Sequence, residues 1–124
     1  MDKETLGKTL RPLLRGLNGT SLDIEASAVM TKDGLTISAV LGEAVDADRL
    51  GAMCATMLSL ADTTSRELAR GDLEQVLIKG STGYVLIVEI GENAVLAVVA
   101  KATINLGMVF LEAKTTARKA MQFF

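Results

Sequence analysis

The spacing of apolar residues changes along this chain, and the changes divide it into helices and strands. Leucines recur at intervals of three and four from Leu6 to Leu17, which predicts an amphipathic helix over residues 3–17. Pro12 falls on the opposite face of this helix and removes one backbone donor there. We therefore expect Pro12 to kink or divide the helix.

Two apolar runs rich in β-branched residues come next, over residues 24–31 and 35–41. The Asp-Gly pair between them is typical of a tight hairpin turn. A longer helix is predicted from the capping residue Asp46 to about Arg70, because a glycine follows at that point. Its apolar residues share one broad arc: Leu50, Met53, Cys54, Met57, Leu58, Leu60, Ala61 and Leu68.

Residues 72–101 hold three more apolar runs, separated by the turns 80–83 and 91–93. Runs of this length broken by Gly and Asn predict an antiparallel meander. A last amphipathic helix is predicted over residues 104–122. The pattern therefore predicts one α+β domain over residues 1–124, in the order αββαβββα.

The composition excludes several function classes. The chain has no His and one Cys, so the commonest general base and metal ligand are missing and no internal disulfide can form. The net charge is −2 and the cations are scattered along the sequence, so we expect no nucleic-acid partner. No apolar run reaches the roughly 20 residues of a membrane span, and the N-terminal residues contain acids rather than an apolar signal region. We expect a cytoplasmic protein without a membrane partner.

Few residues suggest chemistry. The loop Gly80-Ser81-Thr82-Gly83 lacks the Lys-Ser/Thr pair of a phosphate-binding loop and precedes a strand, so it is interpreted as a hairpin turn. Cys54 has no His partner and lies on an apolar arc, which favours a small buried side chain over a nucleophile. Glu89 interrupts an apolar run, and we expect it near solvent. We expect no catalytic residue, metal or cofactor, and hence not an enzyme.

Several local patterns, taken in order, resemble the Roadblock/LC7 family, which includes the bacterial MglB-type proteins. The residues that carry the resemblance are Ala28–Leu35 around the Asp-Gly turn, Leu58–Ala61 in the long helix, Leu73–Ile78 followed by Gly83–Ile87, and Asn105–Gly107. The resemblance implies a five-stranded profilin-like sheet of order 2-1-5-4-3. The first and third helices would cover one face and the second helix the other.

The resemblance also implies a homodimer, joined through the third strand and the second helix, that binds small Ras-like GTPases. The alternative is a structural adaptor subunit in a motility or signalling complex without effect on nucleotide turnover. A small-ligand sensor is a third possibility, which the scarcity of aromatic residues disfavours.

A strand at the edge of a sheet needs a partner or a device that blocks pairing, and the predicted third strand contains no proline. Pairing with its own copy would satisfy its free hydrogen-bonding groups. For the dimer interface we predict Leu73, Gln75, Val76, Leu77, Gly51, Ala55 and Leu58. For the GTPase-facing surface we predict Ala52, Thr56, Ser59, Thr63 and Arg66. Met53 and Met57 remain open between core and interface.

Overall fold

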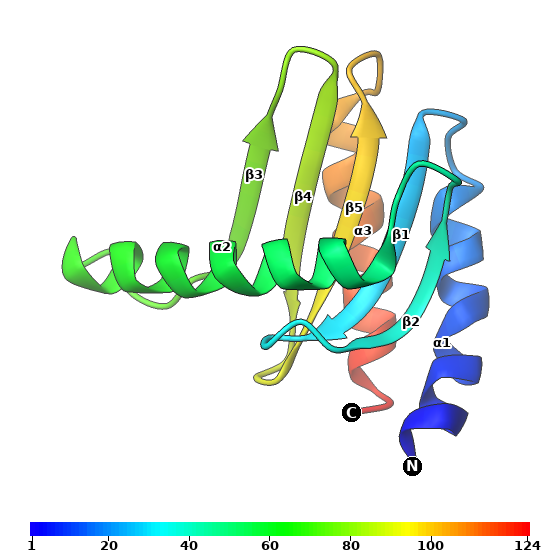
Figure 1. Cartoon of the computed structure of the whole chain (residues 1–124), viewed down its shortest axis with the longest axis horizontal. Helices are drawn as coiled ribbons and strands as arrows, with labels where there is room; N and C mark the ends of the chain where they lie inside the picture. Colours follow the sequence, from blue (N-terminus) through cyan, green and yellow to red (C-terminus); the bar gives the residue numbers. More distant parts are fainter.

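The computed structural model describes residues 1–124 and contains three helices and five strands (Figure 1). In chain order these are α1 Lys3–Asn18, β1 Ile24–Thr31, β2 Thr36–Leu41, α2 Ala47–Glu67, β3 Gln75–Lys79, β4 Gly83–Ile90, β5 Ala94–Lys101 and α3 Leu106–Met121. All neighbouring strands are antiparallel, and their order across the sheet is β2-β1-β5-β4-β3. The predicted element order and sheet topology are confirmed.

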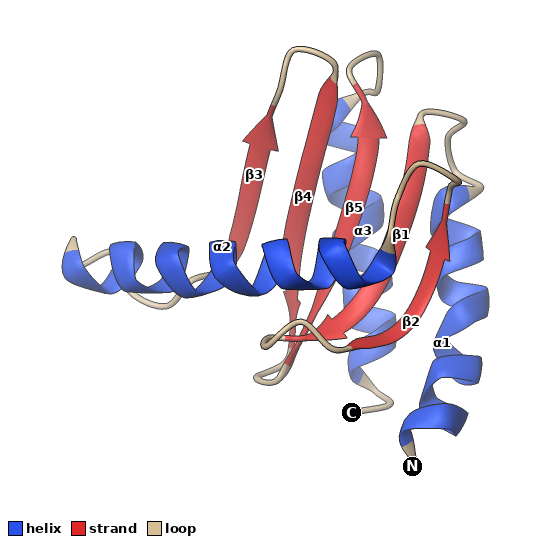
Figure 2. Ribbon diagram, in the orientation of Figure 1, coloured by secondary structure: helices blue, strands red, loops and turns tan.

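The sheet separates two layers of helix. α1 and α3 lie side by side on one face, and α2 crosses the other face at a steep angle to the strands (Figure 2). Successive side chains of a strand point to opposite faces, so the central strands contribute side chains to the cores on both faces of the sheet. β5 is buried along almost its whole length, as expected for a central strand covered on both faces.

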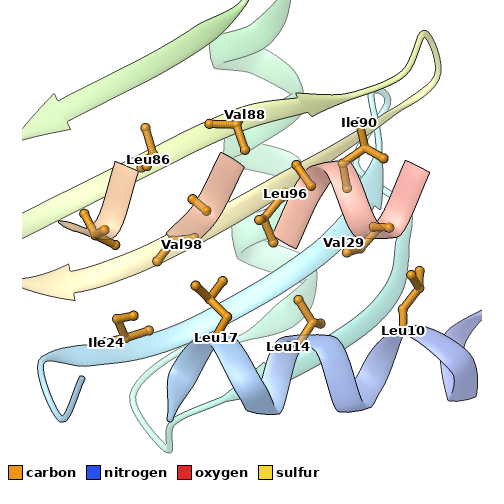
Figure 3. Close-up of a cluster of buried hydrophobic side chains, with 14 of the residues drawn as sticks. Leu10, Leu14, Leu17, Ile24, Val29, Leu86, Val88, Ile90, Leu96 and Val98 are labelled. Carbon is orange, nitrogen blue, oxygen red and sulfur yellow. The ribbon is translucent and has the colours of Figure 1, made fainter. Parts of the chain in front are cut away.

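The larger core lies between the sheet and the α1/α3 layer (Figure 3). The leucines of α1 are among the most deeply buried residues of this core. Leu10, Leu14 and Leu17 are each at most 2% exposed. They face apolar side chains of the strands, including Val29 and Leu96. The period of three and four in the sequence therefore serves to place one side of α1 on the sheet.

The smaller core holds α2 on the opposite face. Leu50, Cys54 and Leu58 are its buried helical members, and they are confined to the first part of α2. At Gly51 the backbone of α2 comes very close to the β1–β2 turn. A Cβ atom added to Gly51 would lie 2.2 Å from the carbonyl oxygen of Gly34. The contact is possible only because neither Gly51 nor Gly34 has a side chain.

Two predicted element boundaries were wrong, and Pro12 does not interrupt its helix. α1 is helical from Lys3 to Asn18, so Pro12 does not divide it, and the kink at Pro12 stays a prediction. α2 ends at Glu67 rather than near Arg70, because Ala69 adopts a positive φ of 55°.

The third strand begins at Gln75 rather than residue 72. Leu73 therefore precedes the strand, where it packs against the smaller core instead of lying in the ladder. The other predicted boundaries agree with the structure to within two residues.

Candidate interaction surface

The distal half of α2 extends past the sheet. α2 has 21 residues and is therefore roughly 30 Å long. Its C-terminal part projects beyond β3 in Figure 1, and Leu58 is its last buried residue. Beyond that point Leu60 is 69% exposed, and Leu68, just after the helix, is 64% exposed. An apolar helix segment without a partner in its own protomer is a candidate interaction surface.

These exposed residues continue a stripe that begins over the sheet. Met53, Met57, Leu60 and Leu68 recur at spacings that place them on one side of the α2 segment, and we refer to them as the α2 stripe. Met53 is half exposed, and Met57 is partly buried against the smaller core. The two methionines left open by the sequence therefore sit at the margin of the core, with Met53 facing outward.

β3 supplies the second part of the surface. It pairs with β4 from Gln75 to Lys79 and has no strand on its other side. Four of its five residues are exposed, including Leu77 at 39% and Ile78 at 40%. It contains neither proline nor a bulge. The backbone groups along this edge are therefore free to pair with another strand.

The opposite edge of the sheet is obstructed. The β1–β2 ladder shifts register between Val29 and Met30, which is a bulge, and α1 packs closely against β2. A Cβ atom on Gly7 would lie 2.6 Å from the carbonyl oxygen of Ile37. The side-chain amide of Asn18 donates to the carbonyl oxygen of Val40 at 3.1 Å. Bulges and a covering helix are the usual devices that prevent edge pairing, so the two edges of the sheet differ in kind.

An apolar hollow of about 520 Å³ lies between the N-terminal half of α2 and the ends of β3 and β4. Ile78 and Val85 are cross-strand neighbours on its floor, and Met53 and Thr56 belong to its helical wall. The hollow adjoins the α2 stripe. The stripe, the hollow and the β3 edge therefore form one surface, on the side of the sheet opposite α1 and α3.

The predicted dimer-interface residues divide into three groups. Gln75, Val76 and Leu77 lie on β3 as expected. Gly51 and Ala55 lie against the β1–β2 turn of their own protomer, since a Cβ on Gly34 would be 3.3 Å from that of Ala55.

Leu58 is 6% exposed and belongs to the smaller core, and Leu73 precedes β3. The flank of α2 that carries the small residues Gly51 and Ala55 is therefore covered by the β1–β2 turn of the same protomer. The opposite flank carries the α2 stripe.

The residues predicted to face a GTPase are all exposed on α2. They are Ala52, Thr56, Ser59, Thr63 and Arg66. Arg66 pairs with Asp62 one helical turn away, with Nε 3.3 Å from Oδ1. These five polar or small residues lie on the side of α2 that faces away from the sheet, apart from the α2 stripe. Ala52 and Thr56 also border the apolar hollow. Leu60, Leu68 and Ile78 were not predicted as surface residues. For Leu60 and Leu68 the signal was that the apolar arc of the helix is wider than one face of a sheet can cover.

Cys54 is fully buried in the smaller core, as predicted. Burial raises the pKa of its thiol from 9.0 to about 11, so the nucleophilic thiolate is disfavoured at neutral pH. The turn at residues 80–83 closes a hairpin, in which the amide of Gly80 donates to the carbonyl oxygen of Gly83 at 2.8 Å. Glu89 is partly exposed and pairs with Lys32 at 3.3 Å. No group of three or more potential metal ligands occurs in the chain.

Comparison with known proteins agrees with this architecture. The family model described as the Roadblock/LC7 domain matches residues 14–100. The chain belongs to the Roadblock/LC7 family. A relative described as uncharacterized protein MJ1340, from Methanocaldococcus jannaschii, is 38% identical over 112 residues, which are 90% of this chain and 96% of that protein.

Solved structures of MglB share the fold. One, described as MglB with tetrameric arrangement, superposes with a TM-score of 0.85 at 16% identity, covering 94% of this chain and 88% of that chain. The gliding protein MglB from Thermus thermophilus gives a TM-score of 0.84 at 16% identity, covering 94% and 89%. Profilin II of Acanthamoeba castellanii gives 0.64 at 21% identity, covering 93% and 99%, so the profilin-like fold class is confirmed. No helix in the structure combines the length and the apolarity that a membrane crossing requires.

Proposed function

We propose that this Roadblock/LC7 protein is a non-enzymatic homodimer that binds a small Ras-like GTPase and alters its nucleotide cycle or its location. The observation that carries the proposal is the combination of a bare β3 edge with an α2 that extends past it. Both features leave apolar surface and backbone groups without a partner inside the protomer, and a second copy would cover both.

The β3 edges of two copies would pair antiparallel about a twofold axis. Such an axis is perpendicular to the sheet, because identical antiparallel neighbours are exchanged by a rotation about the sheet normal. Both copies of α2 would then lie on the same face of a ten-stranded sheet. The projecting end of each α2 would reach over the partner's sheet, where the exposed Leu60 and Leu68 would be buried.

The partner surface follows from the same geometry. The stripe formed by Ala52, Thr56, Ser59, Thr63 and Arg66 points away from the sheet on each α2, so two copies would present one polar platform. The family resemblance supports a small GTPase as the molecule that docks there. The chain has no group of three or more potential metal ligands, and burial raises the pKa of its one thiol to about 11. Its effect on a GTPase would therefore come from binding.

The dimer is tested with Leu60→Asp, measured by sedimentation over a concentration series. Leu60 is 69% exposed in the protomer, so the variant should fold normally. Burial of a leucine contributes about 1.5–3 kcal/mol, and twofold symmetry uses the residue twice, so the dimer Kd should rise roughly 10²-fold or more. Leu22→Asp, at a position that is 98% exposed and remote from α2, is the control and should leave the Kd unchanged. A wild-type chain that sediments as a monomer at micromolar concentration would refute the dimer.

The GTPase surface is tested separately with Ser59→Glu combined with Arg66→Glu. This variant should lose copurification with a small Ras-like GTPase while its sedimentation stays that of the dimer. Phosphate release by the GTPase, with and without the wild-type protein, then distinguishes regulation from attachment. Binding without any change in turnover would favour the structural adaptor, and retained copurification of the double variant would exclude this stripe as the docking surface.

A further inference from the structure

Charge is strongly segregated between the two sides of this protein. Helices α1 and α3 together hold seven of the thirteen Lys and Arg residues but only two of the fifteen Asp and Glu residues, a net charge of +5. The remainder holds six cations and thirteen acids, a net charge of −7. The cations are scattered along the sequence, in residues 3–15 and 114–119, and the fold brings them onto one layer.

The α1 part of this layer is the more clearly cationic. Lys8, Arg11 and Arg15 surround the exposed Pro12 and line an open hollow of about 400 Å³ that contains no acid. Lys8 forms one exposed ion pair with Glu4, at 3.6 Å, which is worth little in water. Neither arginine forms an ion pair. Three neighbouring cations on one helix, two of them without an ion pair, therefore give this part of the layer a local positive charge.

The α3 part adds Lys114, Arg118 and Lys119, all exposed. Lys114 and Arg118 share a hollow of about 310 Å³ with Glu74 and Glu89, without forming ion pairs. Apolar side chains stand among these cations, since Leu111 is 69% exposed and Met121 is 49% exposed. We refer to this surface, formed by the outward side chains of α1 and α3, as the basic face.

We propose that the basic face binds an anionic phospholipid surface. Cations with interspersed exposed apolar side chains match the boundary between headgroups and acyl chains. α1 and α3 lie flat and side by side along the sheet, so they offer a broad surface to a flat partner (Figure 2). Neither helix projects from the layer as it would have to in order to enter a nucleic-acid groove. This proposal replaces the sequence-based expectation of no membrane partner, which considered only membrane spans.

The proposed homodimer would strengthen this binding. A twofold axis perpendicular to the sheet places both basic faces on the same side, which doubles the charge that meets the membrane, and this step rests on the proposed dimer. The acidic remainder of each protomer would be repelled by the same surface. The protein would therefore bind with the basic face against the membrane and with α2 directed toward the solvent, where a GTPase could reach it.

The test is cosedimentation of the full chain with vesicles. Vesicles of phosphatidylcholine with about one-third phosphatidylglycerol should retain the protein at about 50 mM salt and release most of it at about 300 mM, whereas pure phosphatidylcholine vesicles should not retain it. Lys8→Glu, Arg11→Glu and Arg15→Glu combined should weaken binding at least tenfold. The matched control combines Arg49→Glu, Arg70→Glu and Lys101→Glu, which change the net charge equally outside the basic face.

Several results would overturn the proposal. Retention that does not depend on phosphatidylglycerol would exclude an electrostatic surface, and equal losses in the two triple variants would show that only net charge matters. Duplex DNA that binds the wild type more tightly than the vesicles do, with the same loss in the α1 variant, would assign the face to nucleic acid. Leu60→Asp distinguishes this proposal from the dimer, because it should weaken vesicle binding while preserving the preference for anionic lipid.

Discussion

The contact between Gly51 of α2 and Gly34 of the β1–β2 turn allows a sharp test of the structure. Replacing a helical glycine with alanine ordinarily stabilises a protein, by about 0.5–1 kcal/mol, because glycine loses more backbone entropy on folding. At Gly51 the added methyl group would lie 2.2 Å from a backbone carbonyl oxygen of the turn. We therefore predict that Gly51→Ala destabilises the protein.

The magnitude follows from what must move. A carbon and an oxygen atom in ordinary contact are about 3.4 Å or more apart, so α2 or the turn must shift by roughly 1 Å. A shift of α2 loosens Leu50 and Cys54, which are at most 5% exposed. Forced repacking of this kind typically costs about 1–3 kcal/mol and exceeds the gain in helix propensity. We expect a net loss of about 2 kcal/mol in the free energy of unfolding, and a Tm lower by roughly 5–10 °C.

Gly16→Ala in α1 is the matched control. A Cβ atom added to Gly16 would meet no atom within 4 Å outside its own helix, so this variant should be more stable than the wild type by about 0.5–1 kcal/mol. Urea unfolding followed by circular dichroism, at one protein concentration for all variants, measures both changes. If Gly51→Ala is as stable as the wild type, the close approach of α2 to the turn is wrong.

Two further predictions concern buried polar groups. Asn18 accepts a hydrogen bond from the buried hydroxyl of Ser27 at 2.6 Å and donates to Val40. Asn18→Ala should therefore cost about 2–3 kcal/mol in urea unfolding, and adding Ser27→Ala should recover part of the loss because no hydroxyl is then left unpaired; an additive double variant would contradict this. Burial raises the pKa of Cys54 from 9.0 to about 11, so its contribution to stability is complete below pH 9 and is lost as the pH rises toward 11. Between about pH 8 and pH 10.5 the wild type should lose roughly 2 kcal/mol more than Cys54→Ala, and equal losses would show that the thiol is not desolvated.

Much of the fold could be predicted because the signals are local. The leucine period of α1, the Asp-Gly turn and the three-strand meander each depend on neighbouring residues, and each was confirmed. Pro12 does not divide α1, because it lies on the exposed side of the helix, where the loss of one hydrogen bond is tolerated. The early end of α2 could not be predicted, since alanine rarely adopts the positive φ that Ala69 shows.

The candidate interaction surface was harder to predict, because a broad apolar arc does not reveal which part of it faces the sheet. Leu58 and Leu60 both belong to the predicted apolar arc, yet Leu58 is 6% exposed and Leu60 is 69% exposed. The difference arises because the two side chains point about 160° apart around the helix, so Leu58 shares the buried side of Leu50 and Cys54 and Leu60 does not. Gly51 and Ala55 were assigned to an interface for their small size, but the same smallness admits their own β1–β2 turn. Contacts between residues distant in sequence decide both questions.

The two margins of the sheet have a consequence for how far the protein can assemble. β3 has one unpaired side and can therefore pair with one further strand. When the β3 strands of two copies pair with each other, neither has an unpaired side left. On the far margin, the irregular ladder and the overlying α1 offer nothing for a third copy to extend. Growth through backbone pairing would thus terminate at a pair, and a chain rich in valine, isoleucine and leucine would be protected from fibre formation in its native state.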